Sequence, residues 1–442
     1  MHDTQAISRV VDLLDPGASA IFNMTVDEAR AVVGSGDPDA IRKIDGHFAL
    51  LAQEGKTVRM ARTIGRLMRY FIAKRDAGPV LVVADRIDAI HEWLKSEGLD
   101  EQFHPSYTRM VPAHHVVEVS LVGCPDPNPT YHRFFAPRRG VLPPDLDVIG
   151  ERYVRALYRE VAKWLQFVPD TEPIGVCFSG GIDSGSVFLL TYHGLLSMGQ
   201  SPSRLKAFVL SVDRGGADVE QARTFLKRMG LGLFLEEIDA ASAELDLGEA
   251  VRMVEDYKPL DVQAGAMLLA LCRGIRRHYP EWLYLLDGDG GDENLKDYPI
   301  EENPELTIRS VLNNSMLYQE GWGVDSIKHS LTYSGGQSRG YARTYGPTRA
   351  LGFSALSPYT SPAVIEEAEA IPFIELTDWR HDRLYALKGE IVSRGIRALT
   401  GLDMPVFAKR RFQHGVMADR SSSSLFTATS NEFRSAFHAL YQ

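Results

Sequence analysis

The sequence predicts an α/β protein in which helices cover both faces of a parallel sheet, joined to a smaller N-terminal α+β domain. Strand-like and helix-like segments alternate in the second part of the chain, whereas the first part has short strand-like runs separated by turn residues. A proline-rich stretch lies between the two parts. Because a chain of 442 residues is too long for one ordinary hydrophobic core, we expect two domains.

The parallel sheet is predicted from residues 174–178 and 208–212, whose apolar patterns are typical of buried strands. A helix is expected after each of them, the first running to about Met198 and the second spanning residues 219–229. This alternation favours parallel pairing with helices on both faces. The C-terminal third of the chain has mainly helical patterns.

The boundary between the domains is predicted at residues 125–148, a proline-rich linker. Proline disfavours both helices and central strands. A first domain of residues 1–124 therefore precedes the linker, and a second domain of residues 149–442 follows it. The first domain contains strand-like runs at residues 49–52, 70–73 and 80–84.

Composition limits the class of protein. The formal net charge of −10 argues against nucleic acid or an anionic membrane as the main partner. No apolar run approaches the roughly 18–20 residues that span a bilayer, and no signal peptide is visible at the start. The cysteines Cys124, Cys177 and Cys272 lack metal-ligand spacing and are expected to be reduced thiols. These features predict a cytoplasmic enzyme.

The most informative motif is Ser-Gly-Gly-Ile-Asp-Ser at residues 179–184, between an apolar strand and an apolar-periodic helix. Its glycines let the backbone approach a phosphate, and the following helix offers free N–H groups and the positive end of its dipole. Ser179 and Ser184 add hydroxyl donors, and Asp183 is a hard oxygen ligand suited to Mg²⁺. The loop lacks the Gly-Lys-Ser/Thr ending of a Walker A loop. The alternative is an ordinary strand–turn–helix with a glycine-rich bend.

A second, acidic loop follows the strand-like residues 282–286, with the sequence Asp-Gly-Asp-Gly-Gly-Asp-Glu at residues 287–293. Acidic residues at the carboxyl end of a strand can supply a second Mg²⁺ ligand near the first loop. Taken alone, the segment could equally be a Ca²⁺ site or a solvated turn.

Together the two loops resemble those of the asparagine synthetase and β-lactam synthetase superfamily, which split ATP between the α and β phosphates. The likeness extends to residues 207–212, 260–263 and 407–415, so it covers about residues 150–420. It implies an adenine nucleotide alpha hydrolase-like synthetase domain that uses ATP and Mg²⁺.

The resemblance also implies roles for individual residues. ATP would be bound by Phe178, Ser179, Gly180, Gly181, Asp183, Ser184, Leu210 and Gly288. Mg²⁺ would be held by Asp183 and Asp292, and the catalytic residues would be Lys409, Asp289 and Arg343. If the basic loop is aligned one residue differently, Arg410 or Arg411 takes the place of Lys409. For Arg343 the alternative is an arginine on a helix surface.

The first domain resembles the glutaminase domain, of the Ntn-hydrolase type, that precedes the synthetase domain in this family. Glutamine-dependent members use a cysteine at the mature N-terminus as nucleophile. Here Met1 is followed by His2, and the first cysteine is Cys124. These residues cannot replace a thiolate nucleophile. We therefore expect a degenerate structural domain without glutamine hydrolysis.

The expected function is ATP-dependent, AMP-forming amide synthesis on a small-molecule carboxylate, with ammonia or an amine as donor. Aspartate is a poor substrate candidate, because acidic positions of asparagine synthetases correspond here to Gly340 and Ser354. Intramolecular ring closure, as in the β-lactam synthetase branch, is one alternative. A non-catalytic subunit that binds nucleotide is another. The sequence leaves the oligomeric state open, with a homodimer as one option.

Overall fold

A computed structural model describes residues 7–122, 129–297, 300, 307–313, 336–407 and 428–442. They form two compact units. The N-terminal unit contains the described residues up to Ala136 together with residues 336–339 and Phe437–Gln442. The synthetase unit contains the described residues within Pro137–Tyr318 and within Gly340–Ala436. Among the described helices, none is both long and apolar enough to cross a membrane.

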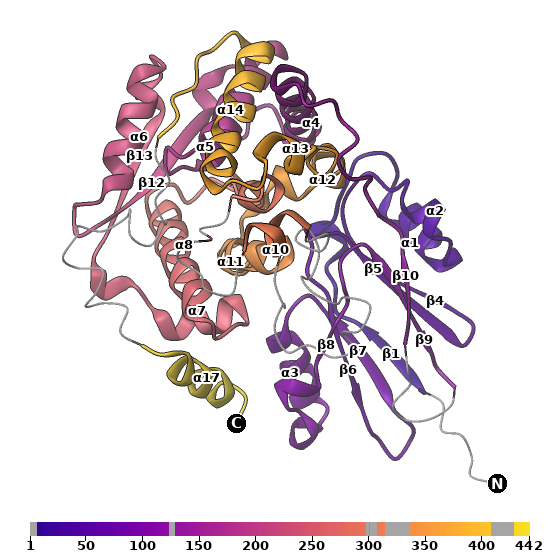
Figure 1. The fold of residues 1–442 in the computed structure, drawn as a ribbon. Helices are drawn as coiled ribbons and strands as arrows, with labels where there is room; N and C mark the ends of the chain where they lie inside the picture. Colours follow the sequence, from indigo (N-terminus) through magenta and orange to yellow (C-terminus); the bar gives the residue numbers. More distant parts are fainter. Residues whose placement is uncertain (1–6, 123–128, 298–299, 301–306, 314–335, 408–427) are drawn as a thin grey trace. The chain divides into compact units, whose positions relative to one another are not determined.

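The N-terminal unit is built on two four-stranded sheets (Figure 1). The first has the order β1 (Arg9–Asp12), β7 (Val80–Ala84), β6 (Arg69–Ala73) and β8 (Arg109–Met110). The second has the order β10 (Thr130–Arg133), β9 (His115–Ser120), β5 (Thr57–Arg62) and β4 (Ala49–Glu54). A small pair joins β2 (Ala20–Ile21) to β3 (Gly46–His47). All these pairings are antiparallel except that of β1 with β7.

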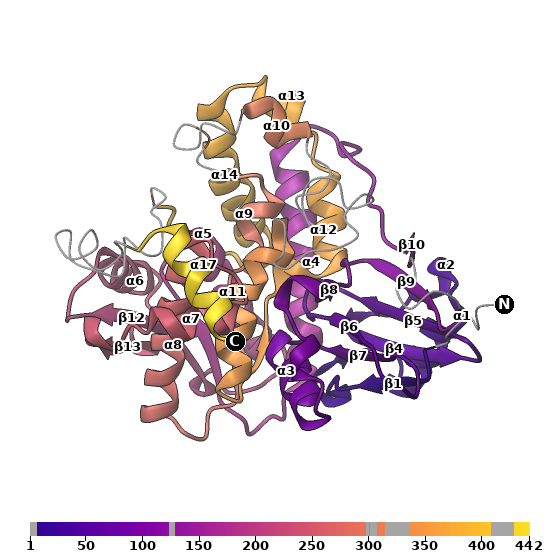
Figure 2. The same cartoon turned by 90° about the horizontal axis from the view of Figure 1, so that it is seen from below.

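One hydrophobic core joins the two N-terminal sheets. Tyr70 and Leu81 come from the first sheet, while Leu51, Val58 and Met60 come from the second. Val58 and Met60 are two residues apart in β5 and point to the same face, which is the alternation expected of a strand with one face in the core. Helices α1 (Val26–Ser35), α2 (Pro38–Ile41) and α3 (Ile87–Ser96) complete the unit, and Figure 2 shows α3 beside β6 and β7.

The synthetase unit contains a five-stranded sheet whose strands are all parallel. Its order is β13 (Leu235–Ala240), β12 (Leu205–Val212), β11 (Ile174–Cys177), β14 (Tyr284–Leu286) and β15 (Ser354–Leu356). The predicted parallel sheet is therefore confirmed, including both strands on which the prediction rested.

Helices pack on both faces of this sheet. Phe208 and Leu210 of β12 share a core with α8 (Pro259–His278), and a Cβ on Gly175 of β11 would touch the Phe208 ring. Gly175 therefore faces α8, and Phe178, three residues further on, faces the opposite side because side chains alternate. There its ring contacts Phe188 of α5 (Ile182–Ser197) and Phe225 of α6 (Ala217–Arg228).

The remaining helices lie wholly or mostly in the synthetase unit, before, between or after the strands of its sheet. They are α4 (Leu146–Phe167), α7 (Leu247–Val254), α9 (Gly291–Asn294), α10 (Ile308–Asn313), α11 (Gly336–Ala350), α12 (Pro362–Glu369), α13 (Phe373–Thr377), α14 (His381–Thr400) and α17 (Ser430–Ala439). The C-terminal third is thus mainly helical in its described part, as predicted.

The structure adds detail around the predicted linker and the C-terminus. Within residues 125–148, Thr130–Arg133 form β10. This strand lies at the edge of its sheet, where nearby prolines are tolerated. At the other end of the chain, the ring of Tyr441 packs edge-on against Phe103 and His91. These aromatic contacts explain why the last residues belong to the N-terminal unit and not to the synthetase unit.

Candidate functional site

The order of the parallel strands predicts where a ligand would bind along their carboxyl ends. The chain runs from β11 to β12 and β13 on one side, then crosses to β14 on the other side of β11. Ligands of open α/β sheets bind where the strand order reverses, outside the carboxyl ends of the strands. The loops that leave β11 and β14 are the two loops singled out in the sequence, so the topology places them next to each other.

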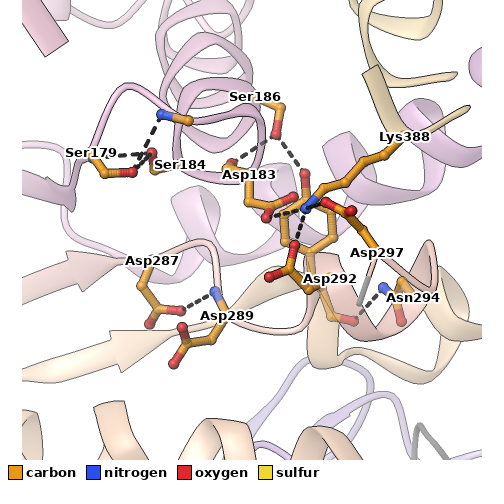
Figure 3. Close-up of polar contacts among 12 residues, drawn as sticks. Ser179, Asp183, Ser184, Ser186, Asp287, Asp289, Asp292, Asn294, Asp297 and Lys388 are labelled. Atoms are coloured by element: carbon orange, nitrogen blue, oxygen red, sulfur yellow. Dashed lines mark hydrogen bonds and ion pairs between the residues drawn. The ribbon is translucent and has the colours of Figure 1, made fainter. Parts of the chain in front are cut away.

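The loop after β11 has an internally bonded turn. The hydroxyls of Ser179 and Ser184 lie 3.2 Å apart, and the Ser184 hydroxyl also accepts the Ser179 N–H at 3.2 Å (Figure 3). Gly180 has φ +73°, and a Cβ there would lie 2.8 Å from the backbone of Ala222 in α6. Glycine is therefore required at this position by both conformation and space.

The two loops make close contact through glycines of the acidic loop. A Cβ on Gly288 would lie 2.8 Å from the backbone nitrogen of Ser184, and a Cβ on Gly291 would overlap the carboxylate of Asp183. Gly288, predicted to bind the cofactor, thus lies against the first loop. This packing brings the start of α9 and the start of α5 together, and with them Asp292 and Asp183.

A lysine that the sequence analysis did not single out lies between the two loops. The Lys388 ammonium donates to Asp183 Oδ2 at 2.6 Å and to Asp292 Oδ1, and it lies 3.6 Å from Asp297 Oδ2 (Figure 3). Its side chain is 3% exposed. Burial disfavours its charge, but Asp183, Asp292 and Asp297 outweigh that effect and raise the pKa of Lys388 well above its usual value. The lysine is therefore charged.

The packing of α14 against α4 determines where Lys388 lies. A Cβ on Gly395 would overlap the Gly150 carbonyl, and a Cβ on Gly150 would lie 2.7 Å from the Ile391 carbonyl. These two glycines let the helices approach closely. The sequence did contain a signal, because Lys388 lies in the apolar stripe of α14 with Leu384, Leu387 and Ile391, all buried.

The donor set fits Mg²⁺ delivered with a nucleotide. Three carboxylates around one ammonium leave the cluster with an excess of negative charge. In the described part of the chain, no group of three histidine, cysteine or acidic side chains is placed to hold a metal alone. Mg²⁺ commonly binds through one or two carboxylates together with substrate phosphates. Asp183 and Asp292, whose side chains are 22% and 40% exposed, are the residues that would hold it.

Buried hydrogen bonds support both loops from behind. The Ser186 hydroxyl donates to the Asp183 carbonyl at 2.8 Å and lies 2.5 Å from the Tyr359 hydroxyl. The Asn294 amide donates to the Tyr359 carbonyl at 3.0 Å and to the Tyr153 hydroxyl at 3.3 Å. Tyr359 therefore connects the first loop to the end of α9.

Asp289 and Asp287 lie on the side of the acidic loop away from Lys388 (Figure 3). Asp289 accepts a hydrogen bond from the Thr344 hydroxyl, and Asp287 accepts one from the Ser357 hydroxyl at 2.6 Å. Burial and their mutual repulsion raise the pKa of the Asp287 carboxyl well above its usual range. Burial also raises the pKa of Asp289, against the lowering effects of Thr344 and Arg343.

Arg343 is held by a buried acid. Its Nε donates to Asp261 Oδ1 at 2.6 Å, and Asp261 is 1% exposed. Asp261, Glu293 and Asp289 raise the pKa of Arg343 despite its burial. Close by, burial and the charge of Asp292 raise the pKa of Glu293 to about 7, against the lowering effect of Arg343. Arg343 is thus a cation that faces the acids Asp261, Glu293 and Asp289.

The other predicted residues lie apart from these clusters. Phe178 packs with Phe188 and Phe225, and Leu210 is part of the core beneath α8. Lys409 lies outside the described residues, as do Arg410 and Arg411. The structure therefore brings Asp183, Asp292 and the Ser179–Ser184 loop together, and it adds Lys388 and Asp297 to them.

Comparison with known proteins gives one family. The family model described as asparagine synthase matches residues 156–380, about half of the chain. That match covers both loops and Arg343, and it ends just before α14. No family was identified for the N-terminal residues. No curated protein matches the chain.

Proposed function

Since the chain belongs to the asparagine synthase family, we propose that it is an ATP-dependent, AMP-forming ligase that adenylates a carboxylate and forms an amide with ammonia or an amine. Enzymes of this family use ATP. The observation that carries the proposal is the convergence of the two glycine-rich loops on Asp183, Asp292 and Lys388, at the reversal of strand order.

The first step needs a site for pyrophosphate as leaving group. In our proposal the Ser179–Ser184 loop and the start of α5 bind the β and γ phosphates through N–H groups and hydroxyls. Asp183 and Asp292 would hold Mg²⁺, which neutralises phosphate charge when bound. A carboxylate oxygen of the substrate attacks the α-phosphorus, and the bond to the β-phosphate oxygen breaks. The products of this step are an acyl-adenylate and pyrophosphate.

Lys388 gives the site a permanent cation next to the leaving group. When phosphates enter, its ammonium can donate to them in place of one carboxylate, because an ammonium has three donors. Lys409 is proposed as the second cation, at the α-phosphate. Preorganised charges that meet charge developing in the transition state are a major source of rate acceleration.

The second step forms the amide. The nitrogen nucleophile attacks the acyl carbon, the bond from that carbon to the AMP oxygen breaks, and a proton leaves the nitrogen. Asp289 is proposed to lie near the acyl carbon, with Arg343 binding a carboxylate of the substrate. Because Asp261 holds Arg343 through Nε, the Nη atoms remain the ones that could face a carboxylate.

We also propose that residues 1–124 form a degenerate glutaminase-like domain of the Ntn type, that residues 125–148 link it to residues 149–442, and that it does not hydrolyse glutamine. Residues 1–123 contain no cysteine that could serve as a thiol nucleophile. Incubation with glutamine and ATP, followed by glutamate analysis, tests this point. Glutamate released in step with amide product would contradict it.

The main experiment is a screen of carboxylic acids with ATP and Mg²⁺, in which AMP and pyrophosphate are measured by chromatography. We expect AMP and pyrophosphate in equal amounts, with an amide product found by mass spectrometry. ADP and phosphate as the stoichiometric products would exclude the proposal.

Two alternatives give different results in the same screen. Intramolecular closure requires a substrate that carries both amine and carboxylate, and it gives a product lighter by one water without added ammonia. A non-catalytic nucleotide-binding subunit would bind ATP but show no exchange of pyrophosphate into ATP with any acid. The loop of Ser179–Ser184 together with Asp292 argues for a catalyst.

A further inference from the structure

The chain makes an unusual turn directly after α9. The N–H of Asp297 donates to the Asp292 carbonyl at 2.9 Å, and the N–H of Lys296 donates to the Glu293 carbonyl at 3.4 Å. This pair of bonds is the Schellman arrangement that ends many helices, and Lys296 occupies its left-handed position with φ +56°. Glycine is the residue usually found there, because a side chain costs about 1–2 kcal/mol in this conformation.

The turn determines where Asp297 lies. The bond from the Asp297 N–H to the Asp292 carbonyl folds the chain back, so that Asp297 lies close to Asp292. Their carboxylates then face the same ammonium, that of Lys388. The conformation of Lys296 is therefore coupled to the positions of the acidic groups next to the proposed metal.

The Lys296 side chain is buried in a charged contact of its own. Its ammonium donates to Glu369 Oε1 at 2.9 Å and lies 5.0 Å from the centre of the Phe373 ring. The side chains of Lys296 and Glu369 are 1% and 3% exposed. Glu369 is the last residue of α12, and its Oε2 also accepts from Arg139 Nε at 3.0 Å. Arg139 in turn donates to the Leu312 carbonyl at 2.8 Å.

Two costs meet at Lys296. The left-handed backbone would be free of strain with glycine, and burying a charged pair costs several kcal/mol before the partners repay it. Strained residues that persist in a fold occur preferentially at functional sites. A lysine here has a use that glycine lacks, because its ammonium attaches the end of the acidic loop to Glu369 of α12.

We propose that Lys296 and Glu369 are positioning residues, which attach the end of the acidic loop to α12 and so hold Asp292 and Asp297 in place for Mg²⁺ and nucleotide. The inference rests on the proposed function, since it concerns the same site. It adds to that function a pair of residues that contact neither substrate nor metal and that act through Asp292 and Asp297.

The test compares Lys296→Met, Lys296→Gly and Glu369→Gln with the full-length protein. In the two Lys296 variants Glu369 keeps Arg139, so the carboxylate does not lose every partner. The glycine variant also relieves the backbone. The matched control is Arg152→Met, which removes the ion pair of Arg152 with Glu367, at 2.9 Å. Glu367 lies on the same helix α12 as Glu369, but the Arg152 side chain is 52% exposed.

The readout is binding of Mn²⁺ with a non-hydrolysable ATP analogue, followed by the electron paramagnetic resonance signal of free Mn²⁺. Loss of an outer contact typically weakens metal binding 10–100-fold. We expect about a tenfold loss of affinity in all three variants and no change in Arg152→Met. Since Lys296 and Glu369 act through their mutual contact, the effects of the two changes should not add. The double variant Lys296→Met with Glu369→Gln should lose no more Mn²⁺ affinity than the single variant that binds Mn²⁺ less tightly.

Different failures have different meanings. Wild-type affinity for Mn²⁺ in Lys296→Gly would overturn the proposal, because the turn alone would then suffice. A lowered melting temperature with unchanged Mn²⁺ affinity in Lys296→Met and Glu369→Gln would also overturn it, since the pair would then only stabilise the fold. If the wild-type protein bound neither Mn²⁺ nor the nucleotide analogue, both this inference and the proposed function would fail.

Discussion

The synthetase unit and the N-terminal unit both bury charged side chains, but these side chains have different partners. In the synthetase unit, Lys388 is 3% exposed and its ammonium faces three carboxylates at the ends of two loops. In the N-terminal unit, Arg62 is fully buried, and its guanidinium donates to the backbone carbonyls of Val111, Thr63 and Arg66.

The difference shows which buried charge is suited to binding a ligand. Backbone carbonyls cannot move away from Arg62 without unfolding the segments that carry them, so Arg62 joins the loops between strands. The carboxylates around Lys388 belong to side chains, and the Asp292 side chain is 40% exposed. They can exchange one cation for another when a ligand enters. Equal burial therefore accompanies a structural role in one unit and a proposed catalytic role in the other.

The largest effect is expected from Lys388→Met. Removing the ammonium leaves the carboxylates of Asp183, Asp292 and Asp297 without their shared cation, which for a buried pair costs about 3–5 kcal/mol. The melting temperature without divalent cations should fall, and added Mg²⁺ should restore part of the loss. Arg394→Met removes an exposed ion pair with Asp147 on the same helix α14 and is the control. Equal melting temperatures for the two variants would contradict a special role for Lys388.

Asp183→Ala and Asp292→Ala should each lower the rate of pyrophosphate exchange on the order of 100-fold or more, if the phosphate clamp is the main catalytic contribution. Exchange is measured over a Mg²⁺ titration with an acid found in the screen. Asp147→Ala, at a side chain 77% exposed, should keep the wild-type rate. Near-normal exchange in both site variants at saturating Mg²⁺ would mean that the metal lies elsewhere.

Arg343→Lys should raise the KM for the carboxylic acid about tenfold, with a smaller change in the KM for ATP. Lysine cannot offer the forked pair of donors, and a hydrogen bond to a charged group contributes about 1.5–3 kcal/mol. Asp261→Asn should act in the same direction, because Asp261 holds the guanidinium. An unchanged KM for the acid in both variants would assign Arg343 a structural role, like that of Arg62.

The last effect concerns stability and not catalysis, and it is expected from a titration in the N-terminal unit. Burial, then Arg62 and the nearby histidines His115 and His47, lower the pKa of His114 well below its usual value of 6.5. Below pH 6.5 the unfolded chain takes up a proton that the folded chain refuses. Stability is therefore lost as the pH falls, by at most about 1.4 kcal/mol per pH unit.

The variant His114→Asn tests this titration, since asparagine tolerates the φ of +62° found at His114. It should reduce the loss of melting temperature between pH 7.5 and pH 5. His132→Asn, at an exposed position in β10, should keep the wild-type pH dependence. The same slope in both variants would locate the titrating group elsewhere.

Sequence alone determined those strands and loops that are encoded by residues adjacent in the chain. The strands at residues 174–178 and 208–212, the glycine-rich turn after the first and the acidic loop at residues 287–293 all follow from short patterns. A glycine-rich loop between a strand and a helix carries its chemistry within a few residues, so Asp183 could be predicted as a Mg²⁺ ligand from its own loop. Asp292 was predicted through the resemblance of the acidic loop to that of the family, and both roles stay predictions.

Only the tertiary structure decided which distant groups complete the site. Lys388 is 205 residues from Asp183, and its helix reaches the loops because Gly150 and Gly395 let α4 and α14 approach closely. Arg343 and Asp261 are 82 residues apart. Whether a lysine is solvated or buried among carboxylates depends on packing between elements far apart in the chain. No local pattern encodes that packing, so the charge partners of the site emerged only from the fold.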